Sequence, residues 1–310
     1  MHGILIVAPL VLVMAMGWVA RRRGLIREES VSQFNDLLYW IGLPALLFRS
    51  TLSVGKDAFS SPNLFFAVHL AFIVTPALAW VLASLYQKDR KRRAVSILVS
   101  VRSNNVYMGI PAIALAMGEP GTRALGLFFA VCMVGYHLVT LTWAQVAISG
   151  GVNRDSLKKT LAGLAKNPLL LACLAGLALA GLGLQALPGV LDEALKIAGA
   201  MASGVALIAL GASLKVEHLF QVLARTWMDV LVRLFLSPAV VWLAFLAWPV
   251  DRVLMQAVVL VSAMPAAVNN FVLADSMGMD STYAGEVIVA STLFSVVSIP
   301  VWVFLLGIAR

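Results

Sequence analysis

The chain is dominated by a succession of apolar stretches, each long enough to cross a lipid bilayer as a helix. About 20 apolar residues in helical conformation span a bilayer core, and the sequence supplies about ten such stretches. Hydrophobic residues make up 61% of the 310 positions, charged residues only 12%, and the mean hydropathy is +0.93. These values lie outside the range of soluble globular domains. The sequence therefore predicts an all-α polytopic membrane protein embedded in a lipid bilayer.

The distribution of basic residues predicts how these spans are oriented. The ten predicted spans are residues 3–20, 34–52, 63–86, 94–117, 123–149, 168–187, 195–214, 227–249, 253–277 and 284–309. With the N-terminus outside, fifteen of the 23 Lys and Arg residues fall in cytoplasmic loops and six on the opposite side. Because cytoplasmic loops carry the excess of basic residues, we expect both termini on the outer, periplasmic side.

Charge, cysteines and motifs argue against several other classes of protein. A net charge of +8 could suggest nucleic-acid binding, but the basic residues form short clusters between apolar runs, which membrane topology explains. Cys132 and Cys173 lie inside apolar stretches, without the spacing of a metal site. The sequence has no His-Glu-x-x-His motif, Walker loop or nucleophile elbow. We therefore expect no nucleic-acid partner, no metal or other cofactor, and no enzyme activity.

The two halves of the chain resemble each other weakly. Gly24-Leu25 matches Gly183-Leu184 at an offset of 159 residues, and Met117-Gly118 matches Met277-Gly278 at an offset of 160. Such residues are common in membrane helices and can match by chance, but the offsets agree across separate helices. An odd number of spans per copy inverts the second copy, so we expect a 5+5 inverted repeat. The expected units are residues 1–149, a short basic cytoplasmic linker at 150–167, and residues 168–310.

Predicted spans 4 and 9 are each interrupted by a proline and a pair of asparagines. Asn104-Asn105 precede Pro111 in span 4, and Pro265 precedes Asn269-Asn270 in span 9. Proline removes a backbone donor and blocks the carbonyl four residues before it. Lipid cannot satisfy the freed backbone groups, so such breaks persist only where protein or a water-filled cavity does so. Two breaks in corresponding helices indicate the binding site of a transporter.

The chemistry of the breaks favours a small organic anion as the ligand. Half-helix N-termini present free N–H donors and a partial positive charge, and asparagine side chains add donors without burying a net charge. Gly109 gives the chain freedom to change direction. Asparagines that join helices and prolines that merely kink them are the structural alternative. The candidate substrate-binding residues are Asn104, Asn105, Tyr107, Gly109, Pro111, Pro265, Asn269 and Asn270.

Four segments carry a family resemblance. They are Asn-Asn-Val-Tyr-Met-Gly-Ile-Pro at 104–111, Ile-Ala-Leu-Gly-Ala-Ser-Leu at 208–214, Met-Pro-Ala-Ala-Val-Asn-Asn at 264–270, and Ser-Thr-Leu-Phe-Ser-Val-Val-Ser-Ile-Pro at 291–300. The chain resembles, essentially end to end, bacterial members of the auxin efflux carrier family, which includes the plant PIN-type exporters and is related to the sodium-bile acid symporters.

The resemblance implies an architecture and a mechanism. It implies a scaffold of spans 1, 2, 6 and 7, a transport domain of spans 3–5 and 8–10, crossing of spans 4 and 9 at the substrate, elevator-type movement, a homodimer, and a bacterial inner membrane. Asn104 or Asn105 would take the place of the carboxylate-binding asparagine, with Pro111 and Pro265 as the crossover prolines. The short linker and the absence of an acidic residue in span 3 depart from the plant exporters. Auxin itself is therefore not inferred.

Ionisable side chains inside predicted spans are candidates for coupling to H⁺ or Na⁺. His69, Arg102, His137 and Glu286 form this set. The histidines could relay protons or simply bond to a backbone carbonyl. Arg102 could attract an anion, reach the surface or pair with an acid. Glu286 could serve ion coupling or face solvent near a loop, and Asp229 and Arg233, four residues apart on one helical face, are expected to pair with each other.

These observations together predict a secondary active or facilitative transporter of a small carboxylate. A membrane sensor or receptor built on a transporter fold is one alternative, and a passive channel is another. Flux into proteoliposomes separates a carrier from a sensor, and saturation with counterflow separates it from a channel. The sequence leaves open the substrate, the direction of transport, the coupling ion and the oligomeric state.

Overall fold

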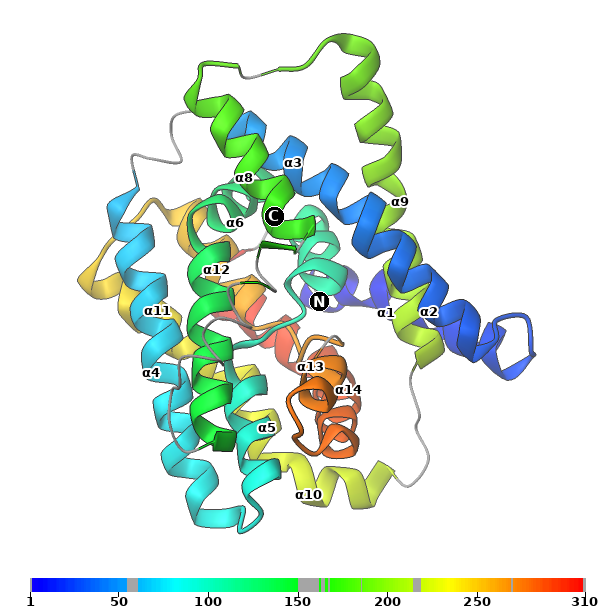
Figure 1. The fold of residues 1–310 in the computed structure, drawn as a ribbon, viewed down its shortest axis with the longest axis vertical. Coiled ribbons are helices and arrows are strands. Elements are labelled where there is room, and N and C mark those ends of the chain that lie inside the picture. Colours follow the sequence, from blue (N-terminus) through cyan, green and yellow to red (C-terminus); the bar gives the residue numbers. More distant parts are fainter. Residues whose placement is uncertain are drawn as a thin grey trace.

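Helices make up most of the described part of the chain in the computed structural model (Figure 1). The structure describes residues 2–54, 61–149, 162, 165–166, 168–184, 186–213, 219–268 and 270–308. Within these ranges, no strand is formed, and the only extended pairing is an isolated β-bridge between Ser103 and Ala266. The all-α prediction is confirmed for this part of the chain.

The helices follow the predicted spans closely, although several spans are divided. The elements are α1 (His2–Arg22), α2 (Glu28–Leu37), η1 (Leu38–Gly42), α3 (Leu43–Val54), α4 (Pro62–Tyr86), α5 (Arg90–Val101), η3 (Asn105–Gly109), α6 (Ile110–Ser149), α8 (Pro168–Gly181), α9 (Gly189–Ser213), α10 (Leu219–Leu231), η4 (Val232–Leu236), α11 (Ser237–Ala247), α12 (Arg252–Ser262), α13 (Asn270–Ser276) and α14 (Ser281–Leu305). The η elements are single π-helical turns, which occur mostly as insertions in α-helices and often at functional sites.

Three helices among the described residues are long and apolar enough to cross a membrane: Pro62–Tyr86, Phe220–Ala247 and Ser281–Leu305. The second of them runs through α10, η4 and α11 without a gap. Predicted spans 4 and 9 are interrupted within the apolar stretch, so no single helix there has the full length, whereas α1 and α9 are continuous over 21 and 25 residues. Ten membrane-crossing spans therefore stay a prediction.

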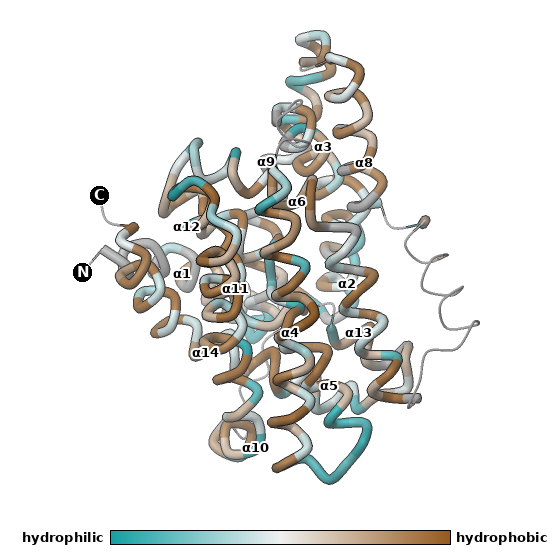
Figure 2. The backbone as a smooth tube through the Cα atoms, turned by 90° about the vertical axis from the view of Figure 1, so that its left-hand side faces the viewer, coloured by the Kyte–Doolittle hydropathy of each residue, from teal (hydrophilic) through white to brown (hydrophobic). Residues whose placement is uncertain are grey.

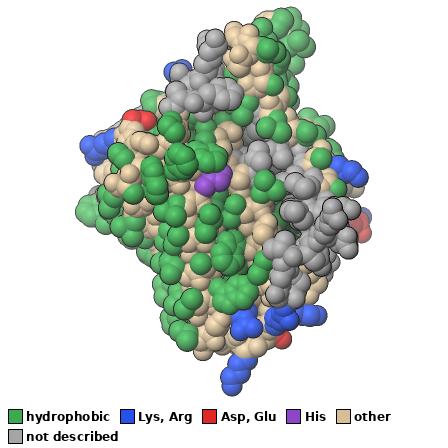
Figure 3. All heavy atoms as spheres, turned by 60° about the vertical axis from the view of Figure 1, so that its left-hand side comes forward, with side chains coloured by type: hydrophobic (Ala, Val, Ile, Leu, Met, Phe, Trp, Pro, Cys, Tyr) green, Lys and Arg blue, Asp and Glu red, His purple; other side chains and the backbone are tan. Residues whose placement is uncertain are grey.

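The outer surface of the bundle is apolar, as a lipid-facing surface must be. Figure 2 shows hydrophobic residues along the middle of the helices and hydrophilic ones at several loops. Figure 3 shows a broad hydrophobic face with several Lys and Arg side chains at its lower end and others at its edges. Leu85, Leu246 and Phe304 are 81%, 74% and 83% exposed. Apolar surface on this scale marks contact with a membrane or a partner.

Two pairs of glycines at the repeat offsets share an unusual backbone conformation. Gly24 and Gly183 have φ angles of 72° and 90°, and Gly118 and Gly278 have φ angles of 62° and 72°. Gly24 and Gly183 each end a helix with the same two backbone hydrogen bonds. The glycine N–H donates to the carbonyl three residues before it, and the N–H of the following leucine donates to the carbonyl five residues before that leucine. Only glycine adopts such angles without strain. Gly118 divides α6, so its first turns complete predicted span 4 and the rest is span 5.

The helices form two groups by their packing. In the first group, α1 packs on α9, and α3 packs on both α8 and α9. Gly17 faces the backbone of Ile208 and Gly211 faces that of Met14, leaving no room for a side chain between α1 and α9. Arg49 binds Asp192 with two hydrogen bonds of 2.7 and 2.9 Å, which joins α3 to α9.

The second group holds the interrupted helices. Here α4, α5, α6, α10, α11, α12, α13 and α14 pack on one another. The groups touch where α1 meets α14 and α6, where α3 and α8 meet α6, and where α9 meets η3. The large hydrophobic core draws its buried residues mainly from the second group, including Leu64, Phe129 and Leu260. The two interruptions therefore lie in a packed protein interior.

Candidate functional site

The two predicted breaks are present, and each separates two helical segments. In the first, α5 ends at Val101 and η3 begins at Asn105, whose preceding residue Asn104 accepts a hydrogen bond from the Tyr107 N–H through Oδ1 at 3.1 Å. In the second, α12 ends at Ser262 and α13 begins at Asn270. Asparagine at the first residue before a helical segment satisfies one of the free N–H groups, which explains why the pair stands at this point.

The two breaks are hydrogen-bonded to each other. Ser103 and Ala266 form an antiparallel bridge, in which the Asn104 N–H donates to the Pro265 carbonyl at 2.7 Å and the Ala267 N–H donates to the Arg102 carbonyl at 2.9 Å. Each break thus supplies the backbone partners that the other lacks. This reciprocal pairing allows irregular backbone to persist inside an apolar bundle.

Arg102 lies in the first break and is 1% exposed. Its Nε donates to Asn270 Oδ1 at 3.0 Å, its Nη1 donates to Thr140 Oγ1 at 3.1 Å, and its guanidinium lies 5.0 Å from the centre of the Tyr136 ring. Asn270, which is fully buried, donates back to the Arg102 carbonyl at 3.0 Å. No acidic side chain of the described residues pairs with Arg102. Its charge is therefore held by neutral groups only, and it neither reaches the surface nor pairs with an acid.

The asparagines of the first break are buried but differ in their bonding. Asn104 is 1% exposed, and its Nδ2 has no hydrogen-bond partner among the described residues. Asn105 is 7% exposed and its Oδ1 accepts a hydrogen bond from Ser103 Oγ. A buried amide donor without a partner is uncommon in native proteins and calls for an explanation such as a ligand. Asn269 lies outside the described residues.

A cavity of about 10 Å³ adjoins the first break. Its polar lining comes from Thr75, Ser103, Asn105, Tyr136, Ser237 and Ser262. This volume accommodates about one water molecule, so a carboxylate enters only if the surrounding helices move. The cavity is closed toward a substrate in this conformation but already lined with hydroxyl and carboxamide groups.

A larger cavity of about 450 Å³ separates parts of the two helix groups. It lies between Ser53 at the end of α3, residues of α6 after Gly118, and the start of α12. Arg123 and Glu119, which line it, are 3.7 Å apart and largely exposed. The volume is in the range of small-molecule pockets.

Gly109 and the prolines have distinct roles in the break. A side chain on Gly109 would begin 2.6 Å from Val261 Cγ2, so glycine is required here because η3 approaches α12 closely. The predicted freedom to change direction is not the reason, since Gly109 is not among the residues with positive φ. Pro111 is the second residue of α6, which continues without a gap from the π-helical turn η3. Pro265 lies outside any helix and contributes its carbonyl to the bridge.

The candidates for ion coupling lie apart from the bridge, except for Arg102. His69 Nδ1 lies 2.7 Å from the Phe65 carbonyl of its own helix, and the two rings stack. Of the two predicted roles for this histidine, the structure shows the bond to a backbone carbonyl. The other ring nitrogen, Nε2, faces Gly135 of α6. His137 belongs to α6, but its side chain is not described. Glu286 Oε1 lies 3.2 Å from Arg225 Nη2, so it forms an ion pair instead of facing solvent alone.

The expected pair of Asp229 and Arg233 is wrong. Asp229 is 1% exposed and accepts hydrogen bonds from the hydroxyls of Tyr86, at 2.8 Å, and Tyr283. Arg233 bonds elsewhere, to Ser100 O, Ser237 Oγ and Ser262 O. A π-helical turn begins at Val232, between the two residues. It rotates Arg233 about the helix axis relative to Asp229, so the two side chains do not lie on one face as they would in a regular α-helix.

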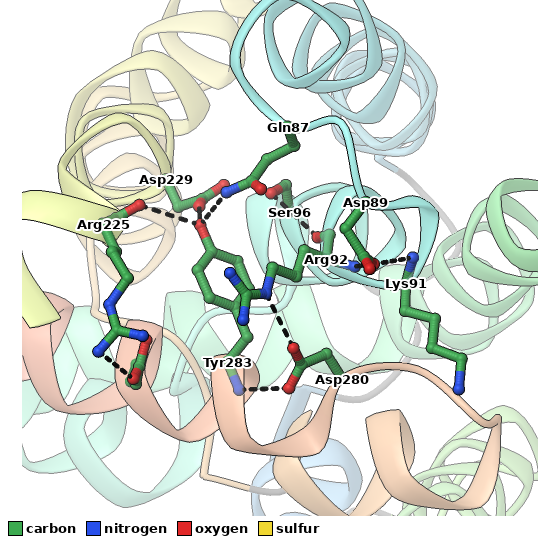
Figure 4. A network of polar contacts seen from close by, with 10 residues as sticks. Gln87, Asp89, Lys91, Arg92, Ser96, Arg225, Asp229, Asp280 and Tyr283 are labelled. Carbon is green, nitrogen blue, oxygen red and sulfur yellow. Dashed lines mark hydrogen bonds and ion pairs between the residues drawn. The ribbon is translucent and has the colours of Figure 1, made fainter.

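Asp229 forms part of a polar network at one end of the bundle (Figure 4). Gln87 donates to the Tyr283 hydroxyl at 2.7 Å, and Arg92 binds Asp280 at 2.9 Å. Burial opposes ionisation of Asp280, but hydrogen bonds from the Tyr283 N–H and from Arg92 hold the pKa of its carboxyl below the usual value. The network ties α4, α5, α10 and α14 together, and no local pattern in the sequence predicts it.

Comparison with known proteins finds a family model and several transporters that match nearly the whole chain. The family model described as "Membrane transport protein" matches residues 2–303. The uncharacterized transporter YfdV of Escherichia coli K12 is 22% identical over 302 residues, covering 96% of this chain and 95% of that protein. A protein of Rhizobium meliloti that is provisionally named a malonate transporter is 25% identical over 300 residues, covering 95% and 92%. An uncharacterized transporter of Methanocaldococcus jannaschii is 26% identical over 319 residues, covering 99% and 98%.

Proposed function

Since the chain belongs to the membrane transport protein family, that of the auxin efflux carriers, we propose that it is a secondary active or facilitative carrier of small carboxylates. The family and the names of its relatives indicate a transporter rather than an enzyme. The observation that carries the choice of substrate is Arg102, a buried cation in the first break with no acidic partner among the described residues. A buried charge is costly unless it is compensated, and a carboxylate supplies the missing charge.

The proposed site lies at the paired breaks. Arg102 supplies positive charge, and the unpartnered Nδ2 of Asn104 supplies a donor. Asn105, Tyr107, Asn269 and Asn270 complete the set, with Pro111 and Pro265 shaping the backbone. The small polar cavity beside Asn105 widens to take the substrate. The provisional name of the Rhizobium relative makes malonate the first compound to test.

The proposed architecture is a 5+5 inverted repeat of ten spans with spans 4 and 9 crossing at the bridge. The matched glycine conformations at offsets of 159 and 160 support the repeat. The first helix group corresponds to the scaffold and the second to the transport domain, and an elevator-type carrier moves one against the other. The 450 Å³ cavity at their boundary is then an access route to the site. A homodimer in the plasma membrane is part of the same proposal.

Transport assays test the function directly. Purified protein in proteoliposomes should take up radiolabelled malonate with saturation, and preloaded unlabelled malonate should accelerate this uptake by counterflow. Uptake that rises linearly with concentration and shows no counterflow would indicate a channel. Malonate binding without any flux would indicate a sensor, and absence of both for mono- and dicarboxylates would refute the proposal.

Labelling of introduced cysteines tests the proposed orientation. In a background without Cys132 and Cys173, we expect a cysteine at Ser53 to react with a membrane-impermeant maleimide in intact cells, because it lies on the outer side. A cysteine at Lys88, in the exposed turn between α4 and α5, should react only after the cells are opened. The reverse pattern would place both termini in the cytoplasm.

A further inference from the structure

Arg233 joins the two interrupted helices beside the proposed substrate site, because its partners Ser237 and Ser262 also line the small polar cavity. Its side chain is fully buried in η4. Nη1 donates to the Ser100 carbonyl at 2.6 Å, and Nη2 donates to the Ser262 carbonyl and, at 3.0 Å, to Ser237 Oγ. Ser100 stands in the last turn of α5 and Ser262 is the last residue of α12. One guanidinium therefore binds the C-terminal ends of both half-helices.

These two helix ends need a positive charge. The last carbonyls of a helix lack partners within the helix, and the aligned peptide dipoles give that end a partial negative charge. The bridge between Ser103 and Ala266 holds the ends of α5 and α12 close together, so their partial charges repel. Broken helices of transporters commonly meet this need with a bound Na⁺ or proton on the freed carbonyls.

The charged side chains near Arg233 are bound to other partners and do not compete for its guanidinium. Asp229, one turn earlier, is occupied by the hydroxyls of Tyr86 and Tyr283. Arg102 is bound to Asn270 and Thr140 on the other side of the break. Among the described residues, no acid forms an ion pair with Arg233, and its Nε has no hydrogen-bond partner. Its charge is met by two backbone carbonyls and one hydroxyl.

We propose that Arg233 is a built-in cation that occupies the carbonyl site between the two half-helix ends, so that the carrier binds and transports carboxylates without Na⁺. The cation site itself stands on the contacts of Arg233, whereas its consequence for transport rests on the proposed function. A tethered cation also travels with the protein, so no cation has to be bound or released in the transport cycle.

Chemical rescue tests the cation site without any substrate. The substitution Arg233→Ala should lower the thermal midpoint of the purified protein by more than about 5 °C, because the carbonyl ends lose their hydrogen bonds to a charged group. Guanidinium at millimolar concentration should restore at least half of the loss, and Na⁺ a smaller part, since a ligand that binds only the folded state stabilises it. K⁺ at the same ionic strength serves as the reference.

Arg225→Ala is the matched control from the same long helix. The Arg225 side chain is 47% exposed and, among the described residues, binds the Glu286 carboxylate and the Gln221 carbonyl of its own helix. Guanidinium should leave its midpoint unchanged. An equal response of both variants, or no response of Arg233→Ala, would overturn the proposal. If Arg233→Ala yields no folded protein, Arg233→Lys and Arg233→Met decide, since one keeps the charge and the other roughly the volume. We expect folded, more stable protein only for lysine, and equal behaviour of the two overturns the proposal.

Transport separates this inference from the proposed function. Wild-type uptake of malonate should be the same in Na⁺, K⁺ and choline. Uptake by Arg233→Ala should fall at least about tenfold, the loss expected for one hydrogen bond to a charged group, unless guanidinium or Na⁺ is present. Wild-type binding that requires Na⁺ would refute the inference and leave the carrier function intact. Absence of any carboxylate transport would refute the carrier function, while the rescue of stability would still decide on Arg233.

Discussion

The substitution Arg102→Gln is expected to weaken carboxylate binding by at least about tenfold while the protein still inserts in the membrane and remains monodisperse. Arg102 is buried at the paired breaks without an acidic partner in the described part of the chain, so its charge is free to attract an anion. Each hydrogen bond to a charged group is worth about 1.5–3 kcal/mol, and loss of one lowers affinity about 10- to 150-fold. Isothermal titration with malonate, or a thermal-shift assay with it, measures this loss.

Two further variants separate charge from geometry at Arg102. Arg102→Lys keeps the charge but cannot bind Asn270 and Thr140 together, so we expect an intermediate affinity. Lys196→Gln removes the same charge from an exposed pair with Glu193 and should bind as the wild type does. Normal affinity of Arg102→Gln combined with a lower thermal midpoint would show that Arg102 only supports the structure, and the site would then lie elsewhere.

The position of the breaks could be predicted because their causes are local. Proline removes a donor at its own position, and asparagine caps the helical segment that follows it, so the pairs in spans 4 and 9 mark both interruptions. The helix bounds follow in the same way from apolar length. The proposed internal repeat also rests on a local signal, since glycines at the matching offsets share a positive φ.

The pairing of the breaks and the roles of the buried ions could not be predicted in the same way. The bridge joins Ser103 to Ala266, and Arg233 reaches carbonyls 133 and 29 residues away in the chain. Helical spacing alone predicted a pair of Asp229 and Arg233, which the π-helical turn at Val232 prevents. Local periodicity places residues on one face of an element, but only tertiary packing decides which distant partner that face meets.

The roles proposed for the two buried arginines at the paired breaks complement each other. In the proposed carrier, Arg233 neutralises the carbonyl ends of the half-helices and Arg102 balances the charge of the substrate. Asp229 is held separately by two hydroxyls. A fixed cation at the helix ends allows Arg102 to act on the anion instead of on the backbone. In a medium of low dielectric constant, such a separation of tasks strengthens each interaction.

Cross-linking the two helix groups should stop transport completely. Cysteines at Ser53 in α3 and Val253 in α12 face the same 450 Å³ cavity from opposite groups. In a background without Cys132 and Cys173, a bifunctional methanethiosulfonate reagent should join them and reduce malonate uptake to background. A reductant should restore uptake. The reason is geometric, since the proposed elevator-type mechanism requires α12 to slide past α3 by more than the short cross-linker allows, as in other rigid-body transitions.

The matched control joins two residues within the second group. Asn63 at the start of α4 donates to the Pro249 carbonyl at 2.7 Å, so cysteines at these positions are close to each other but belong to one moving body. Their cross-link should form under the same reagent and leave uptake unchanged. Full cross-linking of Ser53→Cys with Val253→Cys combined with normal uptake would contradict movement of the two groups against each other, since substrate would then cross through a fixed protein. Loss of uptake in both pairs would instead point to a general loss of flexibility, because a link inside one rigid body has no reason to block a sliding motion between two.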